Sequence, residues 1–331
     1  MLRFLKNWTL PVAIIVGTMS YLVFALVPEL DAVGDALCPV FETLLPFTIF
    51  FTLFVTFSKV DFRLMKLRRW QLYILLTQLL MVVVLVGVIL FNETLSIIHY
   101  PLYKLLLEAV LICVIAPCAS ASPVVTAKLG GDLTQMTSFV LLSSVVMAVL
   151  IPAVFPLLEP HEGATFLTAF FAILQRLSLV LQLPLVLGAI VRLWVKPLYE
   201  WFKRTPDLGF YCWSVSLAIT AGLTIRNINT SHDASHILGD IALLTLITSI
   251  VQFGIGRLIG RAVGEKVCTG QAMFQKNTGL AIWIAYTYLT PAASIGAGCY
   301  VLWQNIINSY ELWQHRRATK GQGVEEKETK S

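Results

Sequence analysis

The chain has 331 residues, of which 57% are apolar and only 13% are charged, and its formal net charge at pH 7 is +5. Soluble domains carry about 25% charged residues, so this composition excludes a soluble globular protein and predicts an integral membrane protein. The Lys and Arg residues alternate between loops rather than gathering on one surface, so we expect the lipid bilayer, and not nucleic acid, as the partner.

Ten mainly apolar stretches follow one another along the chain, each about 20 residues or longer, which is enough for a helix to cross a bilayer. They cover approximately residues 10–27, 36–57, 70–91, 102–129, 133–158, 166–194, 209–228, 237–259, 268–289 and 291–313. We therefore predict an all-α polytopic membrane protein with a ten-helix domain over residues 1–315. Residues 316–331 are too poor in apolar side chains to fold alone, so we expect a disordered cytoplasmic tail there.

Basic residues fall mainly in alternate loops. Twenty of the 24 Lys and Arg residues lie in one set of loops and chain ends, whereas the other set holds only Lys104 and Arg226. The positive-inside rule then predicts a multi-pass protein of the cell's inner (plasma) membrane with both termini in the cytoplasm. The remaining two cations, Arg176 and Lys276, lie within predicted helices. We expect Arg176 to form a structural ion pair with Glu42, because both lie at a similar depth.

Two of the ten helices are interrupted by polar residues near their middle. Residues 116–123 read Ala-Pro-Cys-Ala-Ser-Ala-Ser-Pro in the fourth helix, and residues 274–279 read Phe-Gln-Lys-Asn-Thr-Gly in the ninth. A broken helix frees backbone groups that survive in lipid only where protein or a polar cavity receives them. Because the breaks occupy corresponding positions in two sets of five helices, the pattern is typical of a secondary transporter built from inverted repeats. The preceding helices match as well, since each carries a glutamine, Gln78 or Gln252.

Polar residues near the breaks are candidates for binding a substrate or ion. Lys276 is foremost, because an ionisable residue inside a membrane is functional by default and no acidic residue is adjacent to it. A lysine that only locks helices together is the alternative. The candidate residues are Lys276, Asn277, Gln275, Ser120, Thr126 and Asn305.

The order and spacing of these motifs resemble the bile acid:sodium symporter family of the bile/arsenite/riboflavin transporter superfamily. The resemblance is carried by residues 116–123, Gly131-Asp132, residues 272–280 (Ala-Met-Phe-Gln-Lys-Asn-Thr-Gly-Leu) and Trp303-Gln-Asn-Ile. It implies a core of the third, fourth, fifth, eighth, ninth and tenth helices, in which the fourth and ninth cross at their breaks. The first, second, sixth and seventh helices would form a panel beside the core. An organic anion would bind between core and panel, and alternating access would move one against the other.

The chain departs from this family where the resemblance places the sodium ligands. A sodium ion needs several oxygen atoms at once. Of the family's ligand positions, only Ser122 and Gln78 still offer a side-chain oxygen here, and the others are Ala272, Pro123, Met136, Val140 and Lys276. The resemblance therefore implies that the sodium sites are lost. We expect the Lys276 ammonium to take the place of a sodium ion, donating hydrogen bonds to Gln78 and to carbonyl groups that the first break frees.

These observations predict a secondary transporter of a small organic anion, without sodium coupling, a metal or another cofactor. If Lys276 stays charged, it is a fixed cation that supports anion binding. If burial favours its neutral amine, it could load and release a proton in each cycle and make transport proton coupled.

Two other functions stay open. An arsenite-type or other efflux transporter of the same superfamily is supported by Cys118, because arsenite needs a soft thiolate. A membrane receptor that transports nothing is the second. We do not expect an enzyme, because all five histidines fall in loops or at helix ends and no base lies near a nucleophile. The six cysteines include no Cys-x-x-Cys pair, so neither a disulfide framework nor a zinc site is indicated.

Overall fold

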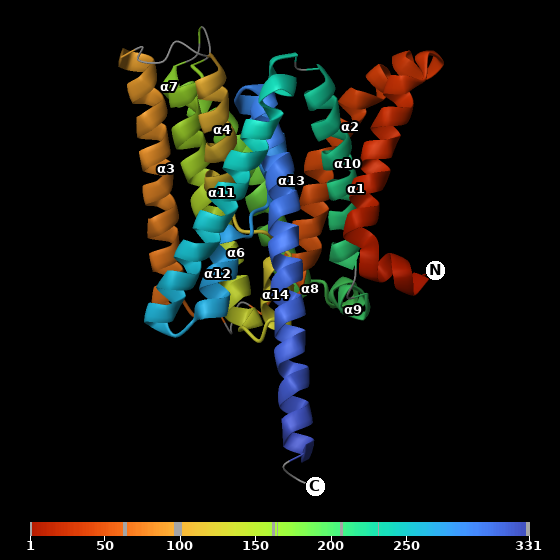
Figure 1. Ribbon diagram of the computed structural model, residues 1–331, viewed down its shortest axis with the longest axis vertical. Helices are drawn as coiled ribbons and strands as arrows, with labels where there is room; N and C mark the ends of the chain where they lie inside the picture. The colour runs from red at the N-terminus through yellow and green to blue at the C-terminus, as the bar shows by residue number, and fades with distance from the viewer. Residues whose placement is uncertain are drawn as a thin grey trace.

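A computed structural model describes residues 2–61, 65–95, 101–160, 163, 165–205, 208–230 and 232–328. Within these ranges every regular element is a helix, and the only strand-like pairing is one isolated bridge between two loops. The helices form a bundle whose long members run roughly along a common axis (Figure 1). The all-helical prediction is confirmed.

The helices take the following order along the chain. They are α1 (Leu2–Leu26), α2 (Pro28–Ser58), α3 (Arg69–Leu95), α4 (Pro101–Ile115), α5 (Ser122–Lys128), α6 (Leu133–Leu158), α7 (Phe166–Leu177), α8 (Leu183–Trp194), α9 (Lys196–Arg204), α10 (Leu208–Thr230), α11 (His232–Val263), α12 (Lys266–Phe274), α13 (Thr278–Tyr288) and α14 (Ser294–Glu328). A π-helical turn, Ser178–Gln182, joins α7 to α8, and a 3-10 turn, Pro291–Ala293, precedes α14.

Five helical stretches in the described residues are long and apolar enough to cross a bilayer. They are Ala32–Ser58, Arg69–Asn92, Leu133–Leu158, Phe166–Trp194 and Ile237–Val263. Two further predicted crossings are each divided at their break, into α4 and α5 and into α12 and α13, so neither half reaches the length of a bilayer alone. Ten crossings therefore stay a prediction.

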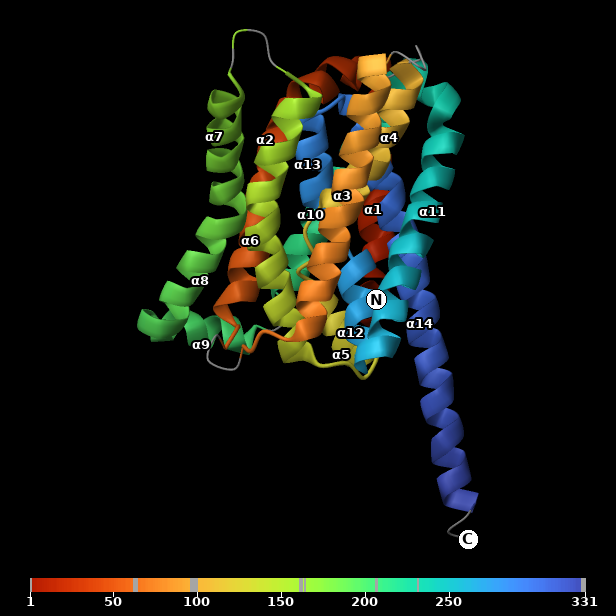
Figure 2. The same cartoon turned by 90° about the vertical axis from the view of Figure 1, so that its left-hand side faces the viewer.

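The helices pack in two groups. In one, α1, α2 and α10 contact one another, α8 packs on α2, and α7 continues into α8 through the π-helical turn. In the other, α11 contacts α3, α4, α12 and α14, and α5 and α6 pack on each other and on α12 (Figure 2). We refer to α1, α2, α7, α8 and α10 as the panel, and to α3–α6 and α11–α14 as the core. The short helix α9 lies across one end of the bundle, and α14 extends beyond that same end (Figure 1).

One expectation from the sequence, the partner of Glu42, is wrong. The structure also continues α14 to Glu328, over most of the segment where the sequence predicts a disordered tail. Once a long helix exists, good helix formers such as Lys, Glu and Gln extend it without a new nucleation cost. Glu42 pairs with Arg226 of α10, at 3.2 Å between Oε1 and Nη1, and not with Arg176. Depth along a helix says nothing about rotation around its axis, and Arg176 instead lies close to Tyr288 of α13.

Close packing of α11 on α12 depends on a Gly-x-x-x-Gly pair, Gly256 and Gly260. Small residues at this spacing let two membrane helices approach closely. A Cβ added at Gly256 would lie 2.5 Å from the carbonyl oxygen of Thr269, and one at Gly260 would lie 2.1 Å from the Thr269 hydroxyl.

Gly256→Ala should therefore destabilise the protein. The new methyl group meets backbone that cannot move without separating α12 from α11, and overpacking of this kind costs about 1–3 kcal/mol. We expect a lower unfolding temperature for the purified protein in detergent. Gly254→Ala is the control, because no atom lies within 4 Å of the Cβ position at Gly254. Equal unfolding temperatures for the two variants would contradict this account of the helix contact.

Candidate functional site

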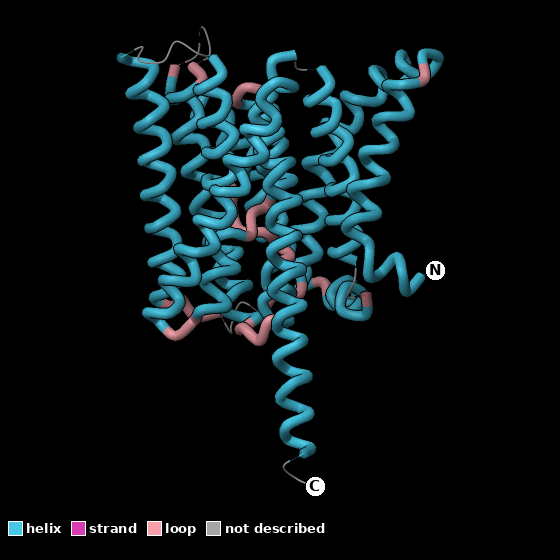
Figure 3. Tube along the Cα trace, viewed as in Figure 1, coloured by secondary structure: helices cyan, strands magenta, loops and turns pink. Residues whose placement is uncertain are grey.

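The two breaks meet in the middle of the bundle. Residues 116–121 separate α4 from α5, residues 275–277 separate α12 from α13, and Cys118 pairs with Lys276 as an antiparallel bridge. Ala119 N–H donates to Gln275 O at 3.0 Å, and Asn277 N–H donates to Pro117 O at 2.8 Å. Figure 3 shows these loops at mid-height of the bundle, away from the loops at its ends. Each break thus satisfies backbone groups that the other leaves free. We call this meeting point, residues 116–121 and 275–277, the crossover.

Neighbouring helices complete the hydrogen bonding of the crossover with side chains. Ser143 of α6 accepts from Cys118 N–H at 3.0 Å. Gln304 of α14 accepts from Lys276 N–H at 3.0 Å, and its amide approaches Lys276 O at 3.5 Å. Each of the two bridged residues, Cys118 and Lys276, thus donates its backbone N–H to a side chain of a neighbouring helix.

Side chains also cap the last carbonyl groups of α4 and α12, the two half-helices that lead into the breaks. A helix end leaves its final carbonyl groups without partners in the helix. Gln78 of α3 donates to Val114 O at 2.7 Å and to Ala116 O at 3.1 Å. Gln252 of α11 donates to Cys113 O at 3.3 Å and to the Tyr300 hydroxyl at 3.1 Å. Tyr300 in turn donates to Phe274 O at 2.7 Å, at the end of α12.

Lys276 is buried in this crossover, with 1% of the residue exposed. Its Nζ has no hydrogen-bond partner, and the described residues place no carboxylate within ion-pair distance of it. The ionisable groups that interact with it are the thiols of Cys118 and Cys113. A buried amine without a partner is unusual, because burial of a polar group is costly unless it is hydrogen-bonded.

The expected hydrogen bond between Lys276 and Gln78 does not form. The Gln78 amide nitrogen already donates to two carbonyl groups of the first break. Among the described residues, the Gln78 Oε1 and the Lys276 Nζ are both buried without a hydrogen-bond partner. The sequence therefore identified the right neighbourhood but assigned the carbonyl groups to the wrong donor, because a neutral amide can satisfy them at a smaller desolvation cost than an ammonium.

The structure brings most of the other candidates to the crossover. Asn277 accepts from Leu280 N–H at 3.2 Å and so caps the start of α13. Ser122 donates to Ala119 O at 2.7 Å, and Ser120 is half-buried in the break. Gln275 has a buried Oε1 without a partner in the described residues.

Two candidates lie further from the bridge. Thr126, one turn into α5, has a buried hydroxyl without a partner among the described residues. Asn305 donates to Val301 O of its own helix at 2.7 Å. Sequence reasoning missed Ser143, Gln304 and Tyr300 as members of the site. They are polar residues within apolar helices, which is a signal, but a sequence does not show which break such a residue faces.

Where the resemblance places sodium ligands, the structure offers few oxygen atoms. Ala272, Met136 and Val140 are buried, with 0%, 0% and 1% exposed, and their side chains carry no oxygen. Pro123 is buried at the start of α5. In the described part of the chain, no group of three or more His, Cys, Asp or Glu residues is arranged to hold a metal ion.

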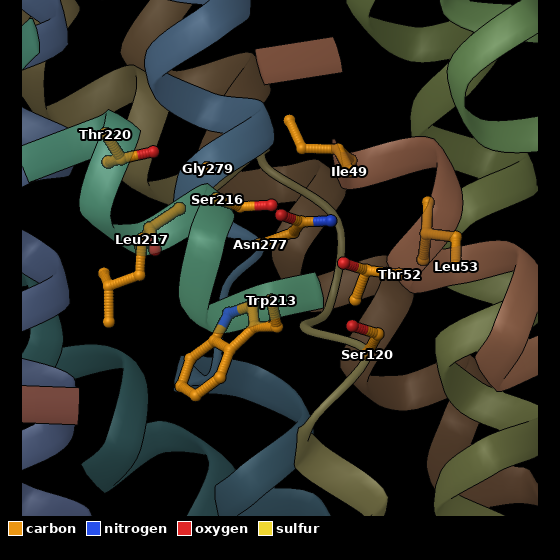
Figure 4. A pocket seen from close by; sticks show the side chains of 11 residues that line it. Ile49, Thr52, Leu53, Ser120, Trp213, Ser216, Leu217, Thr220, Asn277 and Gly279 are labelled. Atoms are coloured by element: carbon orange, nitrogen blue, oxygen red, sulfur yellow. The ribbon is translucent and has the colours of Figure 1, made fainter. Parts of the chain in front are cut away.

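A small gap separates the crossover from the panel. It is lined by Ile49, Thr52, Leu53, Ser120, Trp213, Ser216, Leu217, Thr220, Asn277, Thr278 and Gly279. In Figure 4 the Asn277 amide and the hydroxyl groups of Ser216, Thr52 and Ser120 point toward the same space. The volume is about 20 Å³, which is room for about one water molecule. Polar groups of core and panel thus face each other across a closed contact.

A larger cavity lies further along the same three helices. It has a volume of about 250 Å³ between α2, α10 and α13, and its lining is Glu42, Leu45, Leu223, Ile282, Trp283, Tyr286 and Thr287. Leu45 is one helical turn from Ile49 of the gap, and Leu223 is about one turn from Thr220. Gap and cavity therefore occupy successive turns of one interface between core and panel.

Comparison with known proteins identifies a family. The family model for the sodium bile acid symporter family matches residues 43–255, which is more than half of the chain. The match runs from α2 into α11, so it includes the first break and ends before the second. No curated protein matches the chain.

Replacing Gln78 by Leu tests the capping of the first break. The substitution keeps the size of the side chain but leaves Val114 O and Ala116 O without their donor, and a buried unpaired group costs about 1–3 kcal/mol. We expect a clear fall in the unfolding temperature of the purified protein. Thr77→Val is the control, because the Thr77 hydroxyl donates to Tyr73 O of its own helix. If both variants unfold at the wild-type temperature, Gln78 does not stabilise the break.

Proposed function

Because the chain belongs to the sodium bile acid symporter family, and is thus a membrane transporter, we propose that it moves a small organic anion by alternating access without sodium coupling. The observation that carries the proposal is the crossover with its buried lysine, because buried apolar side chains occupy the positions at which the family resemblance places sodium ligands. Family membership accounts for transport in the membrane. The anion and the absence of sodium are our own inference.

We propose that the fold consists of two inverted repeats of five crossings. The breaks support this, because the loop between α4 and α5 and the loop between α12 and α13 meet in an antiparallel bridge. Their supporting residues correspond too, since Ser143 and Gln304 serve the two sides of the bridge. The distribution of basic residues between loops supports an inner-membrane protein with cytoplasmic termini.

The proposed binding site is the gap between the panel and the start of α13. A helix N-terminus carries partial positive charge and free N–H groups, which suit an anion at mid-membrane. Hydroxyl and amide groups line the gap, and Asn277 caps α13 there. A space for one water does not admit an organic anion, so movement of the core against the panel has to widen it.

Charge argues against sodium at the crossover. Relative to a carboxylate, an ammonium changes the local charge by two units. A sodium ion at about 4 Å from a charged lysine would be disfavoured by roughly 4 kcal/mol at an effective dielectric constant of 20. Lys276 either supplies a fixed positive charge or carries a proton across the membrane in each cycle. In the second case alone, the rate of transport responds to a pH gradient.

The arsenite-type alternative rests on Cys118. This thiol is 2% exposed and lies 3.2 Å from the Ser122 hydroxyl. It does not line the gap or the larger cavity. The geometry thus favours the organic anion.

Uptake by liposomes that contain the purified protein tests the coupling. We expect radiolabelled cholate, a bile acid carboxylate, to enter at equal rates in sodium and in potassium buffers. Faster uptake under an imposed pH gradient would assign a proton to Lys276, and an unchanged rate would assign a fixed charge. Uptake that requires sodium would contradict the proposal, and protein-free liposomes are the control.

Lys276→Met tests the lysine itself. Methionine fills a similar volume without charge, and the Lys276 Nζ makes no hydrogen bond that the protein would lose. We therefore expect at least tenfold slower cholate uptake, with an unfolding temperature that is unchanged or higher. Lys266→Met, at the exposed start of α12, should transport like the wild type. Normal uptake by Lys276→Met would leave the lysine without a role in transport.

A further inference from the structure

The interface between core and panel poses a charge problem for an anion. Among the residues that line the gap and the larger cavity, Glu42 alone is charged, and it is acidic. Lys276 is buried within the crossover and lines neither space. A lone carboxylate would repel an anionic substrate by an energy that low dielectric makes larger than in water. A route for anions along this interface therefore needs a cation close to Glu42.

Arg226 provides that cation. Its Nη1 lies 3.2 Å from Glu42 Oε1, and the side chains of the two residues are 27% and 29% exposed. Arg226 is three residues after Leu223, which lines the cavity, so its guanidinium lies at the end of the cavity away from the crossover. Both partners are panel residues, from α10 and α2.

A core residue joins this ion pair. The Tyr286 phenol of α13 lines the same cavity as Glu42 and interacts with the Glu42 carboxylate and the Arg226 guanidinium. The Cys38 thiol donates to Glu42, at 3.6 Å between Sγ and Oε1. Glu42 thus has a donor besides Arg226 and would not be left unpaired if the guanidinium turned away.

We propose that Arg226 is the residue that selects anions on this route, and that Glu42 occupies its guanidinium when no substrate is bound. The inference rests on the proposed function, because it takes the interface between core and panel as the path of an organic anion. An incoming carboxylate replaces Glu42 at Arg226, whose planar fork fits a carboxylate through two parallel hydrogen bonds. Glu42 keeps the Cys38 donor.

The cavity walls fit the rest of such a substrate. Leu45, Leu223, Ile282 and Trp283 offer an apolar surface next to the ion pair. Because Tyr286 belongs to the core and the ion pair to the panel, exchange of Glu42 for substrate changes a contact between the two groups. Selection of the anion and release of the core from the panel would then occur at the same place.

Equilibrium binding of radiolabelled cholate to the purified full-length protein tests this inference. Arg226→Gln should weaken binding about tenfold or more, since it removes a charge-assisted hydrogen-bond pair. Glu42→Gln should tighten binding severalfold, because the amide competes less well for the guanidinium. Binding of the uncharged methyl ester of cholate should not change in Arg226→Gln. Glu159→Gln is the matched control, since Glu159 pairs with Lys104 at 2.8 Å and lines neither space.

The signs of the two changes separate selection from a structural role. A pair that only holds α2 to α10 would lose stability in both variants, and neither would bind more tightly. The inference is overturned if Arg226→Gln binds cholate like the wild type, or if Glu42→Gln weakens binding. Should Arg226→Gln fail to fold, the Glu42→Gln result decides. Absence of saturable binding to the wild type would contradict the proposed function itself, which distinguishes that failure from this one.

Discussion

Backbone hydrogen bonding at the crossover is the constraint on which the rest of the structure depends. Non-helical peptide inside a membrane bundle persists only where protein groups satisfy it. Here the two breaks pair with each other through Ala119 and Asn277, and side chains of adjacent helices complete the set. Because these bonds fix the path of both loops, they also fix the start of α13 against the panel and the burial of Lys276.

Lys276 places an amine inside a crossover whose backbone groups are satisfied by other residues. The breaks, the pairing and the supporting polar residues form a site at mid-bundle, whereas buried Ala272 and Met136 add no oxygen atoms to it. An amine that belongs to the protein stays with the crossover, unlike a bound ion that has to enter and leave. On the route that we propose for an anion, Arg226 supplies a further positive charge, which Glu42 neutralises in this structure.

The sequence predicted the helical class and both breaks, because apolar length and its interruption are local signals. It did not predict which donors serve which carbonyl groups. Gln78 and Gln252 were matched by position, yet their bonds depend on how α3 and α11 are rotated against α4. The predicted partner of Glu42, Arg176, was wrong for the same reason. Depth in the membrane gives the position of a residue along its helix but not the direction in which its side chain points. The helical extension of α14 was missed because helix continuity depends on the preceding turns as well as on composition.

The central claim is that the protein holds its crossover together without sodium. A ligand that binds only the folded state raises the unfolding temperature, and the rise grows with the ratio of ligand concentration to its Kd. The most direct measurement is thermal unfolding of the purified wild type in sodium, potassium and choline chloride at equal ionic strength. The account predicts the same unfolding temperature in all three salts. A rise that is specific to sodium and grows with its concentration would contradict it.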